Sequence, residues 1–276
     1  MTQAARHPSR MVRLRAGLIV GLLQLVYSLA NLSALSVPAV AMVGGAPAVG
    51  RDLPLHEVMI LSGRGNLCTG TVVAQDLVLT AAHCFDPKLT YRLYELVAER
   101  KPTFREIAKV VVHPQFSLQT FNANIATADV ALLKLAEPLP VKYSPTTLAP
   151  RRARVTVGET FIVAGYGVAT RGDLRTSAVL RRAELAATGK PGNLQLRLFD
   201  PATQGNTPGR GACTGDSGGP VYEERDGKLL VYGLVSWSTG PRASDGCGGL
   251  TGATPLELYL SWIVETARKL GSPLVH

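Results

Sequence analysis

Short apolar runs alternate with clusters of turn-forming residues along the chain from Met42 onward. A first set of runs covers residues 58–61, 71–73, 77–79, 107–112 and 130–135, and a second covers 154–157, 161–165, 194–198, 220–222 and 229–235. Runs of this length predict an all-β protein whose strands are buried on at least one face. Between the two sets, the proline-rich segment 137–150 predicts a connection that joins two β units near 138–152.

A helix is predicted at the end of the chain. Thr254 is a suitable N-cap, Pro255 suits the first helical position, and Glu257 completes a capping box. Apolar residues then recur at helical spacing, at Leu256, Leu260, Ile263, Ala267 and Leu270. Gly271 is typical of the residue that ends a helix. We interpret the apolar stripe as a packing face.

The first 41 residues have the pattern of an export signal. Residues 1–15 are basic and carry no acid, and an apolar stretch begins near Ala16. Polar residues interrupt this stretch before Ala39-Val40-Ala41, a small-x-small pattern of the kind that signal peptidase cleaves. The alternative is an uncleaved membrane anchor, since residues 16–37 are just long enough to span a bilayer. No second apolar run of that length follows, so we expect a soluble mature protein.

Composition and charge narrow the class of protein. The chain has 276 residues, of which 46% are hydrophobic and 18% charged, which excludes a disordered or collagen-like protein. The net charge is +9, but four arginines in the leader account for part of it, which leaves +5 for residues 42–276. These charges form no basic run, so we expect no nucleic-acid partner.

The cysteines favour disulfide bonds. All four, Cys68, Cys84, Cys213 and Cys247, follow the leader. An even number in an exported chain predicts two disulfides, and four cysteines permit three pairings. Because neither a C-x-x-C motif nor a His-rich cluster occurs, we expect no zinc site.

Three short motifs carry candidate chemistry. Residues 79–84 read L-T-A-A-H-C, with His83 at the end of an apolar strand and a cysteine after it. Residues 127–135 read T-A-D-V-A-L-L-K-L, with Asp129 at the start of a buried strand. Residues 211–220 read G-A-C-T-G-D-S-G-G-P, in which glycines permit tight turns that present Ser217 beside free backbone N–H groups.

These motifs, in this order, resemble the trypsin/chymotrypsin-like serine proteases over essentially all of residues 42–265. With the leader, the resemblance predicts a bacterial, exported member of that family. It implies two packed six-stranded antiparallel β-barrels and a C-terminal helix. We expect a signal peptide at 1–41 and a peptidase domain at 42–276, with the first barrel at about 42–148 and the second barrel plus helix at about 149–276.

The resemblance also implies catalytic roles. Ser217 is the expected nucleophile, His83 the general base and then acid, and Asp129 the residue that orients His83. The N–H groups of Gly215 and Ser217 form the expected oxyanion hole. No cofactor or metal is required, and no acidic loop suggests a calcium site.

Disulfides and a specificity pocket follow from the same resemblance. It pairs Cys68 with Cys84 and Cys213 with Cys247. Five residues are expected to bind substrate: Gly211, Ala212, Ser236, Trp237 and Ser238. With Gly211 at the pocket base and Ser238 on its wall, we expect small or medium aliphatic residues before the scissile bond. Residues 250–253, L-T-G-A, depart from the usual family pattern, and Asp245 could also reach the pocket.

Activation is predicted to involve the start of the mature chain. Residues 42–45, M-V-G-G, resemble the first residues of an activated family member. Cleavage after Ala41 then frees the Met42 ammonium, which pairs with Asp216 and orders the oxyanion loop. The alternative is that M-V-G-G is only a strand and turn, with cleavage elsewhere.

Two other functions compete with peptide hydrolysis. A binding protein on the same fold is one, although such proteins usually lose a catalytic residue. An esterase is the other, but its G-x-S-x-G motif is absent and the order His, Asp, Ser differs. We therefore expect a periplasmic or secreted monomer that acts on protein or peptide substrates, with membrane contact only through an uncleaved leader.

Overall fold

The computed structural model describes residues 42–44, 48–49, 55–96, 102–152, 154–188 and 193–274. The predicted leader and its alternative as a membrane anchor lie outside these residues, as does the predicted cleavage site after Ala41. Among the described residues, no helix is both long and apolar enough to cross a membrane.

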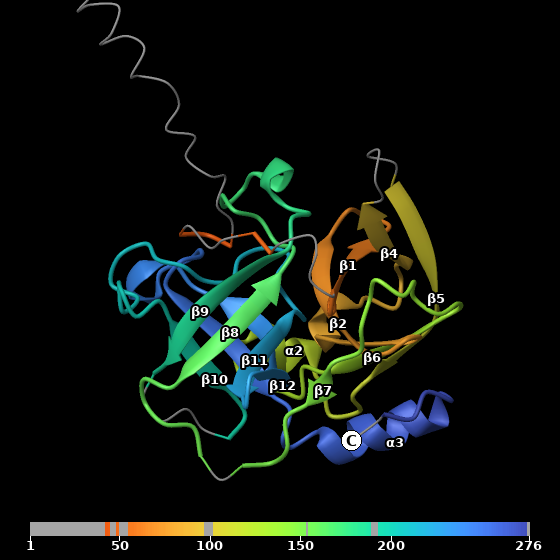
Figure 1. Ribbon diagram of the computed structural model, residues 1–276. Coiled ribbons are helices and arrows are strands. Elements are labelled where there is room, and N and C mark those ends of the chain that lie inside the picture. Colours follow the sequence, from red (N-terminus) through yellow and green to blue (C-terminus); the bar gives the residue numbers. More distant parts are fainter. Residues whose placement is uncertain are drawn as a thin grey trace, which may run out of the picture. The chain divides into compact units, whose positions relative to one another are not determined.

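Six antiparallel strands close the first barrel (Figure 1). They are β1 (Glu57–Ser62), β2 (Leu67–Ala74), β3 (Leu77–Thr80), β4 (Tyr91–Leu96), β5 (Pro102–Val112) and β6 (Ala131–Leu135), in the order β1-β2-β3-β6-β5-β4. Val78 of β3 and Leu133 of β6 face the barrel interior, whereas Leu79 and Leu132 pack in the core shared with the second half. Because β3 and most of β6 are buried on both sides, their sequences are nearly continuous apolar runs, and Lys134 is the one charged residue in them.

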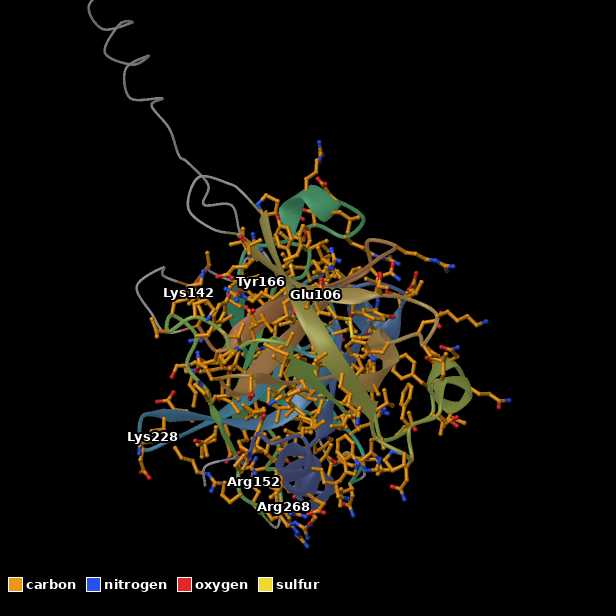
Figure 2. The ribbon with its side chains drawn as sticks, turned by 90° about the vertical axis from the view of Figure 1, so that its right-hand side faces the viewer. Glu106, Lys142, Arg152, Tyr166, Lys228 and Arg268 are labelled. Atoms are coloured by element: carbon orange, nitrogen blue, oxygen red, sulfur yellow. A yellow bond between two sulfur atoms is a disulfide. The ribbon has the colours of Figure 1, made fainter. Side chains whose placement is uncertain are left out.

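Six further strands close the second barrel. They are β8 (Thr160–Gly165), β9 (Arg181–Ala187), β10 (Leu196–Phe199), β11 (Pro220–Arg225), β12 (Lys228–Ser238) and β13 (Leu250–Pro255), and pairing of β11 with β12 completes the closure. Figure 2 shows Lys228 at the tip of the β11–β12 hairpin. The two-residue strand β7 (Thr147–Leu148) adds a parallel pairing to β12. The predicted pair of six-stranded antiparallel barrels is therefore confirmed.

One predicted strand is wrong, and four strands were not predicted. Residues 154–157 form no strand, because Val157 is 67% exposed and Gly158 turns the chain with a φ of +81°. The strands missing from the sequence prediction are β4, β9, β13 and the two-residue β7, which lies within the predicted connection. The short elements between strands are η1 (Ala82–Cys84), α2 (Leu118–Asn122), η2 (Leu174–Thr176) and η3 (Pro241–Ala243).

The C-terminal helix exists, but its predicted start is wrong. The helix α3 runs over Leu260–Lys269, with Tyr259 as its N-cap residue. Thr254 and Pro255 instead end β13, where they pair with Leu234 and Gly233 of β12. The predicted end is right, since Gly271 follows the helix with a φ of +75°. Ile263 and Ala267 are fully buried in the core between the barrels, which confirms the packing face.

Candidate active site

Strand pairing in the first barrel places His83 beside Asp129. Strand β3 ends at Thr80 opposite Ala131, the first residue of β6, so the residues just after β3 and just before β6 are neighbours. The backbone N–H of His83 donates to Oδ1 of Asp129 at 2.8 Å, and Nδ1 of His83 lies 2.7 Å from Oδ2. The Asp129 side chain is 1% exposed and that of His83 15%. This two-point contact fixes the imidazole plane and leaves Nε2 free of Asp129.

The second barrel adds a further contact to this carboxylate. Ser236 of β12 donates its hydroxyl proton to Oδ2 of Asp129 at 2.5 Å. A buried carboxylate requires such donors, because each unpaired charge in the interior is costly. Asp129 therefore joins the two barrels as well as orienting His83.

Ser217 lies on a loop that contacts both barrels. Its carbonyl accepts a hydrogen bond from the Thr69 amide of β2 at 2.8 Å, and Sγ of Cys84, the residue after His83, lies 3.9 Å from the same oxygen. The next residue, Gly218, donates its amide to the Val235 carbonyl of β12 at 2.7 Å. The serine is thus fixed where the end of the His83 strand meets the second barrel.

The turn before Ser217 depends on glycine. Gly215 has a φ of +97°, and a Cβ there would lie 2.7 Å from the Leu67 side chain. Thr69 secures the turn by donating its hydroxyl to the Gly215 carbonyl at 2.8 Å. This left-handed conformation is accessible to glycine without steric cost, and it determines where the Gly215 N–H lies.

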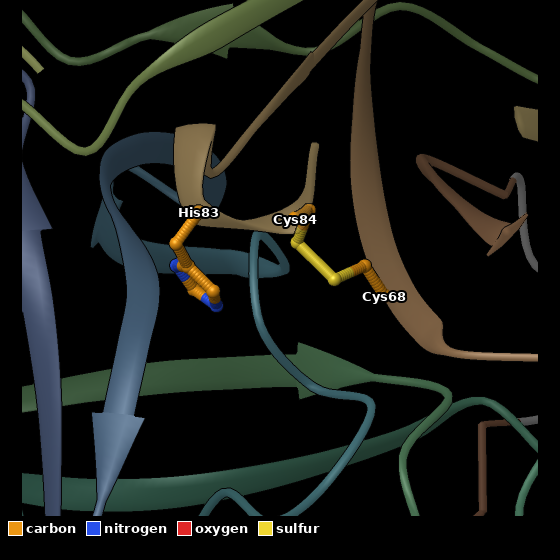
Figure 3. A group of neighbouring side chains, drawn as sticks. All are labelled: Cys68, His83 and Cys84. Carbon is orange, nitrogen blue, oxygen red and sulfur yellow. A yellow bond between two sulfur atoms is a disulfide. The ribbon is translucent and has the colours of Figure 1, made fainter. Parts of the chain in front are cut away.

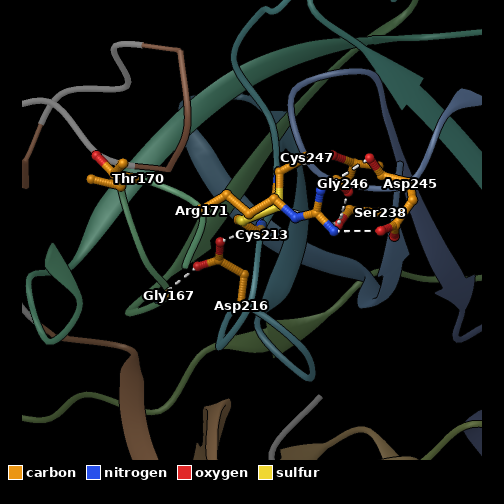
Figure 4. Close-up of a disulfide and its surroundings, with 12 residues drawn as sticks. Gly167, Thr170, Arg171, Cys213, Asp216, Ser238, Asp245, Gly246 and Cys247 are labelled. Atoms are coloured by element: carbon orange, nitrogen blue, oxygen red, sulfur yellow. Dashed lines mark hydrogen bonds and ion pairs between the residues drawn. A yellow bond between two sulfur atoms is a disulfide. The ribbon is translucent and has the colours of Figure 1, made fainter. Parts of the chain in front are cut away.

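Asp216 is buried beneath this turn. Its carboxylate accepts hydrogen bonds from the amides of Gly167 and Cys213, both at 2.8 Å (Figure 4). A Cβ at Gly165 or Gly167 would lie within 2.2–2.6 Å of the carboxylate, so both positions require glycine. Burial raises the pKa of the Asp216 carboxyl to about 7, because two amides and the field of Arg181 compensate the charge only in part.

The segment that follows residue 41 is docked against the second barrel. Met42 is fully buried in that barrel's core, and Val43 forms an antiparallel bridge with Gly211. Gly44 packs so closely on Gly209 that a Cβ would lie 2.2 Å from its carbonyl group. In the full chain the Met42 nitrogen is an amide, so no α-ammonium accompanies Asp216.

A disulfide and a threonine border the predicted specificity pocket. Cys213 pairs with Cys247, and Cys68 pairs with Cys84, the same pairs that the resemblance implies. The Ala212 amide donates to Oγ1 of Thr251 at 2.9 Å, and a Cβ on Gly211 would lie 3.1 Å from that oxygen. Thr251 was not among the predicted site residues, although it belongs to the L-T-G-A segment noted as unusual.

The pocket entrance carries Ser238 and, further out, Asp245. The Ser238 hydroxyl donates to the Gly246 carbonyl at 3.3 Å, next to the disulfide of Cys247 (Figure 4). The Asp245 side chain is 93% exposed and pairs with Arg171 at 2.5 Å. Its charge is therefore directed to the surface and matched there. Trp237, between these elements, lies over Gly252, where a Cβ would be 1.9 Å from the indole.

An aromatic contact on His83 was also not predicted. The Phe121 ring, from α2, stacks on the imidazole with centroids 4.5 Å apart and planes 10° from parallel. No local sequence motif identifies Phe121 as a site residue, because α2 reaches His83 only through the folding of the loop between β5 and β6.

One group of metal-ligand residue types does not fit a metal ion. Cys68, His83 and Cys84 bring their ligand atoms within 4.8 Å of one another (Figure 3). Both sulfurs belong to one disulfide, so neither can act as a thiolate ligand. Nδ1 of His83 is engaged by Asp129.

Comparison with known proteins agrees with this geometry. The chain is 29% identical to Trypsin-4 of Rattus norvegicus over 226 residues, which are 78% of this chain and 86% of the relative. It is 27% identical to Trypsin of Sus scrofa over 82% of this chain and 95% of the relative. It is 28% identical to Kallikrein-11 of Homo sapiens over 73% and 72%. A model of the Trypsin family matches residues 42–263, and the chain therefore belongs to the trypsin family of serine proteases.

Proposed function

We propose that this protein is an exported bacterial endopeptidase that hydrolyses peptide bonds with Ser217, His83 and Asp129. The observation that carries the proposal is the double contact of His83 with Asp129, by N–H to Oδ1 and Nδ1 to Oδ2. With Nδ1 engaged, the neutral imidazole presents Nε2 as its proton acceptor.

The proposed reaction proceeds through an acyl-enzyme. Ser217 Oγ attacks the scissile carbonyl carbon while Nε2 of His83 takes the hydroxyl proton. The amides of Gly215 and Ser217 bind the oxyanion that forms, and such a donor is worth about 2.7–4 kcal/mol of barrier. His83 then protonates the leaving amine as the C–N bond breaks. His83 then takes a proton from a water molecule, whose oxygen attacks the acyl carbon, and gives that proton to Ser217 Oγ as the ester C–O bond breaks.

We propose that the residue before the scissile bond is small or medium and aliphatic. Gly211 offers no carboxylate to a basic side chain, and the adjoining Thr251 is neutral. Asp245 is already paired with Arg171. The bond from Ser238 to the Gly246 carbonyl supports a narrow entrance.

We further propose that export and activation are one cleavage, after Ala41. The docked positions of Met42 and Val43 support this, because the segment already lies against Gly211 in the uncleaved chain. A freed Met42 ammonium would supply the charge that the buried Asp216 carboxylate otherwise lacks. A periplasmic or secreted location follows from such a leader.

The experiment that tests the function combines active-site labelling with a peptide library. A chain beginning at Met42 should label at Ser217 with a fluorophosphonate and cleave after Ala, Val or Leu. Intact protein that neither labels nor cleaves would contradict the catalytic proposal. Dominant cleavage after Arg or Lys would contradict only the preference.

Gly211→Asp sharpens this test. A Cβ at position 211 would lie 3.1 Å from Thr251 Oγ1, and the backbone φ of Gly211 is not positive. The new side chain therefore requires only a small shift of the Thr251 side chain. We expect cleavage after Arg and Lys to rise at least about tenfold relative to Ala, as a charge pair in a confined pocket strengthens binding by 1.4 kcal/mol or more. Gly211→Asn is the uncharged control.

A further inference from the structure

A second pocket lies beside the Ser236–Ser238 segment. Its volume is about 530 Å³, and it lies along the cleft, with Phe121 and Ile125 from the first barrel on one side and Leu194, Arg197 and Trp237 from the second on the other. Gly211 and Ala212 are not among its walls. The pocket is therefore separate from the predicted specificity pocket, although Ser238 borders both.

Three charged side chains line this pocket, and they differ in whether an opposite charge lies beside them. The Arg197 guanidinium lies 5.9 Å above the Trp237 ring, and no carboxylate of the described residues forms an ion pair with it. Asp245 carries the opposite charge on the wall, but Arg171 compensates it at 2.5 Å. Asp129, at the inner end, is 1% exposed and engaged by His83 and Ser236. The pocket thus offers one uncompensated positive charge.

Arg197 is also partly ordered for binding. The guanidinium lies within cation–π range of the indole, a contact that restrains it and leaves its N–H groups available to an acceptor. Gln195 and Ser244 line the same space and add neutral donors. A carboxylate is the group that matches a cation and neutral donors together, because each of its oxygens accepts several hydrogen bonds.

We propose that this pocket receives an acidic substrate side chain, two to four residues before the scissile bond, and that Arg197 determines this preference. The proposal rests on the peptidase function proposed above. Because Ser236-Trp237 resembles the substrate-binding strand of the family, a substrate whose side chain lies between Gly211 and Ser238 would have its preceding residues along Ser238 and Trp237, which line this pocket. Those neighbours then reach the pocket that Arg197 lines.

The test uses peptides that differ only in one residue. Glu, the isosteric Gln, and Lys are placed in turn at the second, third and fourth positions before the bond, and kcat/KM is measured for each. At one position we expect Glu to exceed Gln about two- to fivefold, the range for an exposed charge pair, and Lys to be slowest. The preference should shrink in 1 M salt.

Three variants test whether Arg197 causes the preference for Glu over Gln. Arg197→Gln should abolish the Glu-to-Gln ratio. Arg64→Gln removes an exposed arginine from the β1–β2 turn and should preserve it. Asp245→Asn should increase it, because the variant removes the negative charge from the pocket wall. Each ratio is taken within one variant, so differences in the amount of active protein cancel.

The outcomes separate this inference from the function on which it rests. An enzyme that labels at Ser217 and cleaves all three peptides equally overturns the inference and leaves the peptidase intact. A Glu preference that survives Arg197→Gln, or disappears in Arg64→Gln, also overturns it. A chain that neither labels nor cleaves any peptide overturns both.

Discussion

The two barrels supply their parts of the active site in different ways. The first supplies His83 and Asp129, which follow and precede two strands that are buried on both faces and paired with each other. The Asp129 carboxylate contacts both the amide and the imidazole of His83, and both contacts are already present in the full chain. The half of the site that we propose to transfer protons is thus determined by residue identity at two positions next to paired strands.

The second barrel supplies Ser217 through backbone conformation instead. Gly215 and Gly218 both have positive φ values, and Gly218 packs directly on β2 and β3 of the first barrel. Asp216, beneath the turn, is buried without an ion-pair partner among the described residues. This half depends on the absence of side chains and on the charge state of one carboxyl. Substitutions in the first half should therefore lower activity while the fold is kept. Substitutions in the second half should displace the backbone that carries Ser217.

The largest expected effect tests the shared chemistry. Ser217→Ala should lower kcat/KM by about 10⁴–10⁶-fold with unchanged thermal unfolding, and His83→Ala should cost nearly as much. The double variant should be little worse, because the nucleophile and its base act in one step. Losses that multiply, measured on chains beginning at Met42, would show that the two residues act independently.

The next effect concerns Asp216 and pH. Its pKa is about 7 in the folded uncleaved chain and 3.8 as the reference value, so the folded state binds more protons between these values. The contribution of the protonated Asp216 carboxyl to the free energy of unfolding is complete below pH 3.8. It is lost as the pH rises from 3.8 through 7, by roughly 4 kcal/mol in total. In a chain beginning at Met42, the ammonium favours the carboxylate and the fall should disappear.

Urea unfolding from pH 3.5 to 8.5 measures this difference. The compared chains begin at Ala41 and at Met42, each carrying Ser217→Ala so that neither digests itself. Asp216→Asn in the longer chain is the matched control and should remove the slope. Parallel pH profiles for the two chains would contradict the pairing of Met42 with Asp216. An untrimmed Ala41 chain with Ser217 intact and full activity would contradict the activation proposal.

The same contrast explains what the sequence could predict of the fold. Strands β3 and β6 are nearly continuous apolar runs because both of their faces are buried, and they were predicted although β6 contains Lys134. Strand β4 includes the buried Glu95, which pairs with Arg105, and β9 begins with two arginines, so neither shows an apolar run. Strand β13 contains Gly252, which the indole of Trp237 requires, and a glycine argues locally against a strand.

The site shows the same division between local and tertiary information. His83, Asp129 and Ser217 stand in short local motifs, and the resemblance of these motifs to the trypsin/chymotrypsin-like proteases is what predicted them. Thr251 and Phe121 carry no such motif. Thr251 reaches Ala212 because β13 pairs with β10 and β12, and Phe121 reaches His83 through a loop. Contacts of this kind depend on tertiary packing, which the spacing of apolar residues along the sequence does not reveal.

A smaller effect should follow from adding one methyl group where the barrels touch. A Cβ on Gly218 would lie 2.0 Å from Thr80 Oγ1 and 2.5 Å from the Thr69 carbonyl, and its φ is +79°. We expect Gly218→Ala to lower the free energy of unfolding by about 2–4 kcal/mol through strain and overpacking. Gly227→Ala, at a φ of +72° with open space around it, is the control and should cost only about 1 kcal/mol. Equal losses would show that the barrel contact adjusts freely.

The smallest effect concerns the stack of Phe121 on His83, a side-chain contact within the first barrel's half of the site. The parallel rings at 4.5 Å restrain the imidazole on the face that Asp129 does not control. Phe121→Leu keeps apolar volume but removes the aromatic face, so an aromatic contact worth about 0.5–1.5 kcal/mol is lost. We expect kcat to fall about two- to tenfold, with Phe121→Tyr close to wild type because the stacking ring remains. Leu118→Ala, an exposed residue of the same short helix, controls for disturbance of α2. Burst-phase kinetics on an ester and an amide substrate would place the loss in the acylation step, where His83 must receive the serine proton. If Phe121→Leu acylates as fast as wild type, the stack is packing alone and the orientation of His83 rests entirely on Asp129.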